Sequence, residues 1–69
     1  MLPYLKNMRD LREDNDLTQQ QLAELLHTTQ SRYSSYERGV SPLPIPSLMA
    51  LCRFYSVSTD VFLGLTKKQ

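Results

Sequence analysis

The stretch that decides the fold is LTQQQLAELLHTTQSRYSSYERG, which runs from Leu17 to Gly39. Its first half repeats apolar residues at the spacing with which a helix buries one face: Leu17, Leu22, Ala23 and Leu26. Thr18 and Gln21 have the spacing of a capping box, in which each side chain bonds the other residue's backbone N–H. The sequence therefore predicts a helix from Thr18 to about His27.

The second half predicts another helix after a tight turn. Thr28 and Thr29 break the apolar pattern, and Thr29 is a good N-cap for a helix from Gln30 to about Arg38. Gly39 follows directly, where helices often end. Two helices joined by so few residues must cross at a steep angle, and the small Ala23 lets them approach closely.

These motifs, LTQxxLAxxL followed by YERG, resemble the phage-repressor (Cro-like) helix-turn-helix family of DNA-binding regulators, of the xenobiotic-response-element type. The resemblance extends from Leu11-Arg12 through Pro44, Leu48 and Leu51 to VSTDVFLG, so it covers nearly the whole chain. Several motifs in the right order are far more specific than one short match. The resemblance implies an all-α, lambda-repressor-like domain of five helices, with the helix-turn-helix at the second and third.

Two residues depart from the family pattern. His27 stands at the turn position where the family usually has Gly, and His tolerates a left-handed backbone better than β-branched residues do. Tyr33 stands at an inward position that is usually Ile or Val. It is bulkier, and its hydroxyl needs a hydrogen-bond partner.

The resemblance places the N-terminus of the third helix in the DNA major groove. Gln30 can bond adenine with two hydrogen bonds, Ser31 can donate or accept, and Arg32 can read guanine or hold phosphate. The family residue that matches Gln19 contacts phosphate. Arg32 and Arg38 could both be phosphate contacts, and the alternative for the whole set is ordinary polar surface. The predicted DNA-binding residues are Thr18, Gln19, Thr29, Gln30, Ser31, Arg32, Ser34, Ser35 and Arg38.

The resemblance also implies an ion pair between Arg12 and Glu37, which would tie the first helix to the third. The alternative is a surface arginine. Such a pair is weak evidence for net stability, but the loss of one partner leaves the other charge without its counter-charge.

The remaining sequence predicts three further helices. Tyr4, Met8 and Leu11 recur at helical spacing in a segment from Pro3 to near Asp14. After the loop VSPLPIPS, Pro46 opens a helix at its first position, and its apolar stripe is Leu48, Leu51, Cys52 and Tyr55. Ser58 caps a short fifth helix, whose apolar side is supplied by Val57, Phe62 and Leu63.

Composition limits the classes of protein that fit. Sixty-nine residues make one small domain, predicted over 1–69 with a basic tail at 66–69. The sequence contains no apolar run long enough to span a membrane, and we expect no leader peptide. The chain has one His and one Cys, which supports neither a metal cluster nor a nucleophile paired with its base. It has only two glycines, which does not support a glycine-rich phosphate-binding loop. We therefore expect no enzyme, no cofactor and no metal. The single Cys fits a reducing compartment.

The expected function is sequence-specific binding of double-stranded DNA, as a transcriptional regulator and most simply a repressor. Two alternatives are an antitoxin that uses the same fold to bind its operator and also binds a toxin, and a protein-interaction module that no longer binds DNA. The formal net charge of only +1 favours the latter. We expect a bacterial or phage-encoded protein in the cytoplasm, associated with the nucleoid, that binds a near-palindromic operator as a homodimer. Apolar residues crowd the fifth helix, so the predicted dimer interface there is Val61, Phe62 and Leu65.

Overall fold

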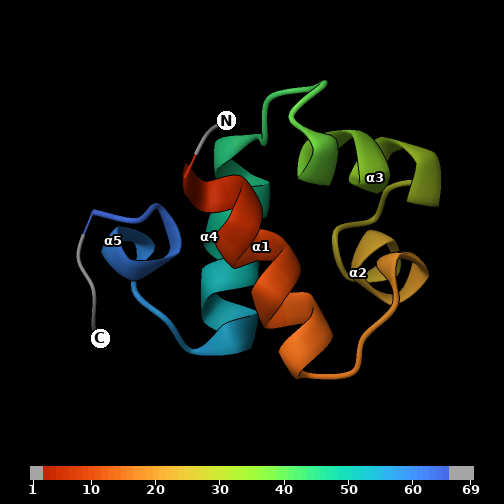
Figure 1. Cartoon of the computed structure of the whole chain (residues 1–69). Coiled ribbons are helices and arrows are strands. Elements are labelled where there is room, and N and C mark those ends of the chain that lie inside the picture. Colours follow the sequence, from red (N-terminus) through yellow and green to blue (C-terminus); the bar gives the residue numbers. More distant parts are fainter. Residues whose placement is uncertain (1–2, 66–69) are drawn as a thin grey trace.

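The computed structural model describes residues 3–65, and every regular element in that part of the chain is a helix. The helices are α1 (Pro3–Asp14), α2 (Gln19–Leu25), α3 (Gln30–Arg38), α4 (Ile45–Tyr55) and α5 (Thr59–Phe62) (Figure 1). The predicted all-α architecture is confirmed. The predicted basic tail at 66–69 lies outside the described residues. None of the helices in 3–65 is long and apolar enough to cross a bilayer.

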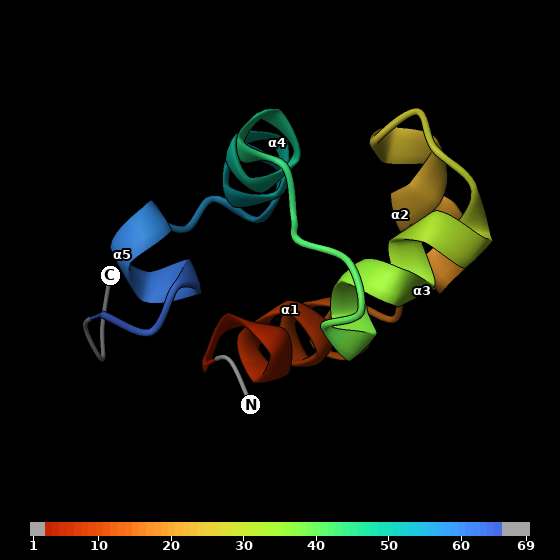
Figure 2. The ribbon, with the colours of Figure 1, turned by 90° about the horizontal axis from the view of Figure 1, so that it is seen from above.

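The five helices surround one apolar core. Helices α1 and α4 form the middle of the molecule, with α5 at one end and the α2–α3 pair at the other (Figures 1 and 2). The longest dimension is 30 Å. Every helix contributes to the core, whose buried residues are Met8, Leu22, Ala23, Tyr33, Tyr36, Leu51, Cys52 and Phe62. The side chains that fix the orientation of α3 are therefore held by the rest of the domain.

The caps of the helix-turn-helix are those predicted. Thr18 Oγ1 accepts from the Gln21 backbone N–H at 3.1 Å, and Gln21 Oε1 accepts from the Thr18 N–H at 2.8 Å. In Figure 1, α2 is seen end-on while α3 runs across the view, so the two helices cross steeply. Helix α2 ends at Leu25, two residues earlier than predicted, because His27 has a left-handed φ of 58° that no helix can continue through.

Gly39 ends α3 in the left-handed region, at φ 75°. A Cβ atom at this position would meet Leu5 Cδ1 at 2.8 Å. Leu5 is buried on α1, so a larger residue must shift the end of this side chain as well as strain the backbone. Glycine turns the chain out of α3 without that strain and lets the turn lie against α1.

His27 offers a direct test of the strained turn. A left-handed conformation costs a residue with a Cβ about 1–2 kcal/mol, and glycine avoids this cost. We expect His27→Gly to raise the free energy of unfolding by about 0.5–1 kcal/mol, because part of the gain is lost to the greater freedom of glycine in the unfolded chain. Urea denaturation measures it, with His27→Ala as the matched control that keeps the strain. A gain of equal size in the alanine variant would show that the imidazole, and not the backbone, is unfavourable.

Helix α4 begins one residue earlier than predicted. Pro44 is its N-cap and Ile45 its first residue, so Pro46 stands at the second position and not the first. Proline is tolerated anywhere in the first turn, because those backbone N–H groups have no partner inside the helix. The predicted stripe faces inward, with Leu51 and Cys52 buried and Leu48 and Tyr55 packed against the core.

Helix α5 is capped at both ends. Ser58 Oγ accepts from the Val61 N–H at 3.1 Å, as predicted. At the other end, the Asn7 side chain on α1 donates to the Phe62 carbonyl at 3.0 Å, a contact the sequence analysis missed. Helix α5 is thereby fixed on α1.

The position of Phe62 corrects the prediction of the dimer interface. Phe62 is fully buried, and its ring stacks on Tyr4 with centroids 6.5 Å apart. A short helix directs its largest side chain to the core first, so Phe62 is not available at the surface and this part of the prediction was wrong. Val61 is half-buried, whereas Leu65 is 73% exposed.

Candidate nucleic-acid interface

Helix α3 has one buried and one exposed face. Tyr33, Tyr36 and Glu37 follow the i, i+3, i+4 spacing and are buried. On the other side Gln30, Ser31, Arg32 and Arg38 are exposed, and Ser34 and Ser35 are partly so. The predicted binding residues of α3 therefore share one face, while the buried residues fix the rotation of the helix about its axis.

The exposed face of α3 begins at a shallow hollow of about 230 Å³, lined by Thr29, Ser31, Arg32, Ser35 and Ser41. Hydroxyl groups and one guanidinium supply its polar atoms, a set that suits phosphate oxygens and base edges. Thr29 also caps the helix, since its Oγ1 accepts from the Arg32 N–H at 3.1 Å. Four of these residues were predicted. Ser41 was missed, because nothing in a proline-rich loop indicates which side chain folds back toward α3.

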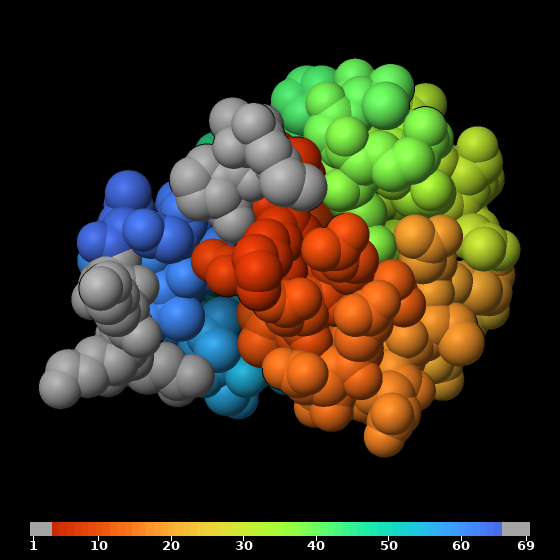
Figure 3. Space-filling model, in the orientation of Figure 1, coloured from red at the N-terminus to blue at the C-terminus, as the bar shows by residue number. Residues whose placement is uncertain are grey.

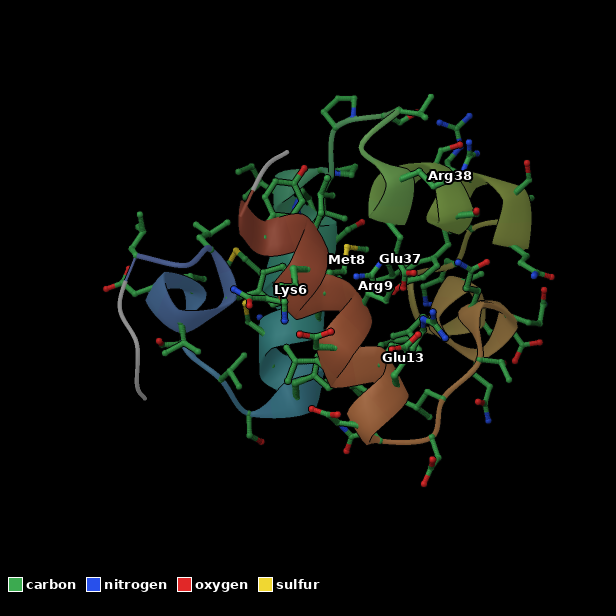
Figure 4. All side chains as sticks on the ribbon, in the orientation of Figure 1. Lys6, Met8, Arg9, Glu13, Glu37 and Arg38 are labelled. Atoms are coloured by element: carbon green, nitrogen blue, oxygen red, sulfur yellow. The ribbon has the colours of Figure 1, made fainter. Side chains whose placement is uncertain are left out.

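Arg38 lies along the exposed face and does not extend freely. Its Nε donates to Ser34 Oγ at 3.3 Å and its Nη2 donates to Ser35 Oγ at 3.4 Å. The Ser35 hydroxyl donates in turn to the Ser31 carbonyl at 3.2 Å. Figure 4 shows Arg38 on the outer side of α3 and Glu37 pointing toward α1. These bonds hold a positive charge over the last two turns of the helix.

Glu37 pairs with Arg12 as the family resemblance implied. Arg12 Nε lies 2.7 Å from Glu37 Oε2, and Arg12 Nη2 donates to Oε1 at 3.2 Å. The two side chains are only 14% and 4% exposed. Arg12 Nη1 also donates to the Leu17 carbonyl at 3.0 Å. The hydrogen bond with Glu37 raises the pKa of Arg12, against a smaller lowering by burial.

Gln19 joins this ion pair, which the sequence did not indicate. Its amide donates to Glu37 Oε1 at 3.2 Å, so one carboxylate connects α1, α2 and α3. An amide carries two N–H groups, so the contact with Glu37 leaves one for another acceptor. The hydroxyl of Thr18, the other predicted residue of α2, serves the capping box. These two residues lie at the start of α2, apart from the hollow on α3.

Two tyrosine hydroxyls are buried near the same carboxylate. Burial raises the pKa of Tyr55 to about 12, with Glu37 adding to the effect, and raises the pKa of Tyr33 in the same way. Within residues 3–65, neither hydroxyl has a hydrogen bond of good geometry. Both phenols are therefore neutral at physiological pH and leave Arg12 as the counter-charge of Glu37.

The charges are distributed unevenly, although the net charge is only +1. Five of the seven acidic residues lie between Asp10 and Glu24. The single acidic residue of α3 is the buried Glu37, so the exposed face of α3 carries Arg32 and Arg38 without an opposing carboxylate from its own helix. Such a segregation of charge favours contact with a polyanion.

No group of three or more metal-ligating side chains occurs among residues 3–65. Cys52 is buried, and burial raises the pKa of its thiol, which suppresses the nucleophilic thiolate. It packs in the core as an apolar residue.

Comparison with known proteins identifies the family. A family model described as helix-turn-helix matches residues 8–62. YobD from Bacillus subtilis (strain 168), named an uncharacterised HTH-type transcriptional regulator, is 41% identical over 63 residues, which cover 91% of this chain and 56% of that protein. ImmR, an HTH-type transcriptional regulator of the same organism, is 34% identical over 59 residues, or 86% of this chain and 46% of ImmR.

A third relative is BcrR from Enterococcus faecalis, named an HTH-type transcriptional activator. It is 32% identical over 63 residues, which cover 91% of this chain and 31% of BcrR. The chain thus spans about half, or less, of the length of these relatives. No solved structure gives a significant match. The matched segment contains the whole α2–α3 unit with its caps and its Arg12–Glu37 pair, and the chain belongs to the helix-turn-helix family.

Proposed function

We propose that this chain is a sequence-specific DNA-binding regulator of transcription, acting as a repressor, with α3 as its recognition helix. The observation that carries the proposal is the division of α3 into a buried face and a face of polar and cationic side chains. Base edges are read by such side chains on a helix held rigidly in the major groove. YobD and ImmR, named transcriptional regulators, and BcrR, named a transcriptional activator, support the regulation of transcription but not repression in particular.

The proposed binding surface follows from the positions of the side chains. Gln30, Ser31 and Arg32, on the first turn of α3, contact base edges, with Ser35 one turn further along. Thr29, Ser34 and Arg38 contact the backbone. Thr18 and Gln19 contact phosphate from the start of α2, where free backbone N–H groups and the helix dipole favour an anion. This role places the protein in the cytoplasm, on the nucleoid, and it needs no enzyme activity and no cofactor.

The test is selection of bound sequences from a random duplex pool, followed by binding measurements over a salt series. We expect one preferred, near-palindromic sequence that binds two copies. A dimer making six to ten phosphate contacts loses about 10³–10⁵-fold in affinity between 50 and 200 mM salt. Binding that is weak and insensitive to salt would instead favour the protein-interaction module, which the low net charge supports.

Gln30 is the residue best placed to read a base. We expect Gln30→Ala to weaken binding to the preferred site by about 1–3 kcal/mol and to relax the preference at one base pair, because a bidentate contact is lost. Fluorescence anisotropy on the preferred duplex and its single-base variants measures both effects. The matched control is Gln20→Ala, since the Gln20 amide bonds Glu24 on α2 at 3.2 Å. Equal losses on specific and random DNA would show that Gln30 reads no base.

A further inference from the structure

The core contains two buried hydroxyl groups that lack a hydrogen bond of good geometry within residues 3–65. They belong to Tyr33 on α3 and Tyr55 on α4. A hydroxyl that is removed from water without a partner is costly, so buried polar groups in native proteins are nearly always paired. We therefore expect an acceptor close to both phenols.

The carboxylate of Glu37 is the acceptor that both phenols lie near. Tyr33 precedes Glu37 by four residues on α3, so the two side chains share the buried face of the helix. The charge of Glu37 also adds to the effect of burial in raising the pKa of Tyr33 and of Tyr55. Charges act in this way on groups within about 4–6 Å. The two phenols and the carboxylate therefore form one cluster.

Glu37 can accept only one further hydrogen bond. A carboxylate has about four acceptor positions, shared equally by its two oxygens. Oε1 already accepts from Arg12 Nη2 and from the Gln19 amide, both at 3.2 Å, and Oε2 accepts from Arg12 Nε at 2.7 Å. The remaining position is on Oε2, and it can satisfy one phenol but not both.

Tyr33 suits this position better than Tyr55 does. Although its geometry is not that of a full hydrogen bond, the interaction of the Tyr33 hydroxyl with Glu37 contributes to the raised pKa of Tyr33, whereas Glu37 acts on Tyr55 only through its charge. Tyr55 in turn acts on Tyr33, so the two phenols are neighbours. A phenol oxygen accepts as well as donates, so Tyr33 can receive a bond while it donates its own proton.

We propose that the Tyr33 hydroxyl donates to Glu37 Oε2 and accepts from the Tyr55 hydroxyl. We call this row of three groups the hydroxyl link. A small shift of the side chains closes both bonds, because a hydroxyl hydrogen rotates to suit its acceptor. An aliphatic side chain at position 33 could supply neither bond.

The hydroxyl link connects α4 to the proposed recognition helix. Helix α3 packs mainly against α2 and α1, and in Figure 2 the ribbons of α3 and α4 stand apart, so side chains carry the connection between them. In Figure 3, α1 meets the α2–α3 unit along a continuous surface, which covers this side of the core. Hydrogen bonds are stronger in such an interior than in water. The link therefore fixes the rotation of α3 about its axis, and Tyr33 and Tyr55 are positioning residues.

The sign of a stability change tests the first bond. Tyr33→Phe removes the hydroxyl and keeps the ring. If the hydroxyl donates to Glu37, the variant is expected to raise the unfolding equilibrium constant about 10- to 100-fold in urea denaturation, because a bond to a charged group is lost. Tyr36→Phe is the matched control, since it removes the same atom from α3 outside the link. A Tyr33→Phe variant as stable as wild type, or more stable, would mean that the hydroxyl is unpaired and would overturn the proposal.

A double-mutant cycle tests the second bond. Tyr55→Phe is expected to raise the unfolding equilibrium constant about 3- to 10-fold in the wild-type background. In the Tyr33→Phe background Tyr55 has already lost its acceptor, so the same change is expected to lower the constant or leave it unchanged. Equal losses in both backgrounds would show that Tyr55 bonds another group, and that α4 is not part of the link.

Proton NMR supplies a signature that a change in packing alone would not give. In wild type the hydroxyl protons of Tyr33 and Tyr55 are expected to exchange slowly with water and to give separate downfield signals. In Tyr33→Phe the Tyr55 signal is expected to move upfield or to disappear through faster exchange. A Tyr55 signal that is identical in the folded variant and in wild type would contradict the second bond.

The DNA measurement concerns positioning, and it alone rests on the proposed function. Tyr33→Phe is expected to weaken binding to the selected duplex about 10-fold and binding to random duplex less than about 2-fold, because base readout needs a precisely held helix whereas attraction to phosphate does not. Equal losses on both duplexes would overturn the positioning role. If wild type binds no duplex, the proposed function fails, while the unfolding cycle and the NMR signals still decide whether the link exists.

Discussion

Replacing Glu37 with alanine is expected to lower the free energy of unfolding by about 3–5 kcal/mol, because the change leaves the largely buried guanidinium of Arg12 without its counter-charge. It also removes the acceptor of the Gln19 amide, so α1, α2 and α3 lose their common contact. A domain of this size has a total stability of roughly 3–10 kcal/mol. The variant is therefore expected to be partly or wholly unfolded at 37 °C.

Urea denaturation of the two single variants and of Arg12→Ala with Glu37→Ala tests this coupling. The double variant is expected to be more stable than the sum of the single losses predicts, because neither charge is then stranded. Glu13→Ala is the matched control. Glu13 lies 3.9 Å from Arg12 but is 58% exposed, so its loss is expected to cost less than about 1 kcal/mol. Strict additivity of the Arg12 and Glu37 effects would contradict the contact seen in the structure.

Replacing Phe62 with alanine is expected to lower the free energy of unfolding by about 3–5 kcal/mol. Its ring is fully buried, stacks on Tyr4 and fills the space between α5 and the rest of the core. The loss combines the apolar area returned to water with the cavity left behind. Thermal and urea unfolding followed by circular dichroism measures it.

Leu65→Ala supplies the control for Phe62, because Leu65 lies three residues further along and is 73% exposed. We expect it to change stability by less than about 0.5 kcal/mol. A Phe62→Ala variant that kept full stability but lost self-association would contradict the burial of Phe62 in the core and support its predicted place in the dimer interface.

Much of the helix-turn-helix is predictable because its determinants are local. The capping box at Thr18 and the cap at Thr29 each depend on residues three positions apart, so the sequence alone places the starts of α2 and α3. Gly39 marks the end of α3 for the same reason. The end of α2 was predicted two residues too late, since no glycine marks it and His27 adopts the left-handed conformation instead.

Contacts between helices are where the sequence analysis failed. Nothing local indicates that the amide of Gln19 bonds Glu37, eighteen residues away, or that Asn7 bonds the end of α5. The burial of Phe62 depends on how a short helix rotates against α1, which crowding of apolar residues does not determine. Arg12 and Glu37 are also far apart in the sequence, as Gln19 and Glu37 are. Their pairing was predicted only because a family resemblance supplied the partner.

The two faces of α3 have a consequence for how this protein can change. Stability depends on Tyr33, Tyr36 and Glu37, which are buried, whereas the proposed base contacts of α3 use the other side of the helix. Substitutions on the outer face therefore leave the core untouched, and operator preference can drift or be re-engineered without a compensating change elsewhere. A library restricted to the outward positions of α3 should yield mostly folded proteins with many different preferences, so this domain is well suited to acquiring new regulatory targets.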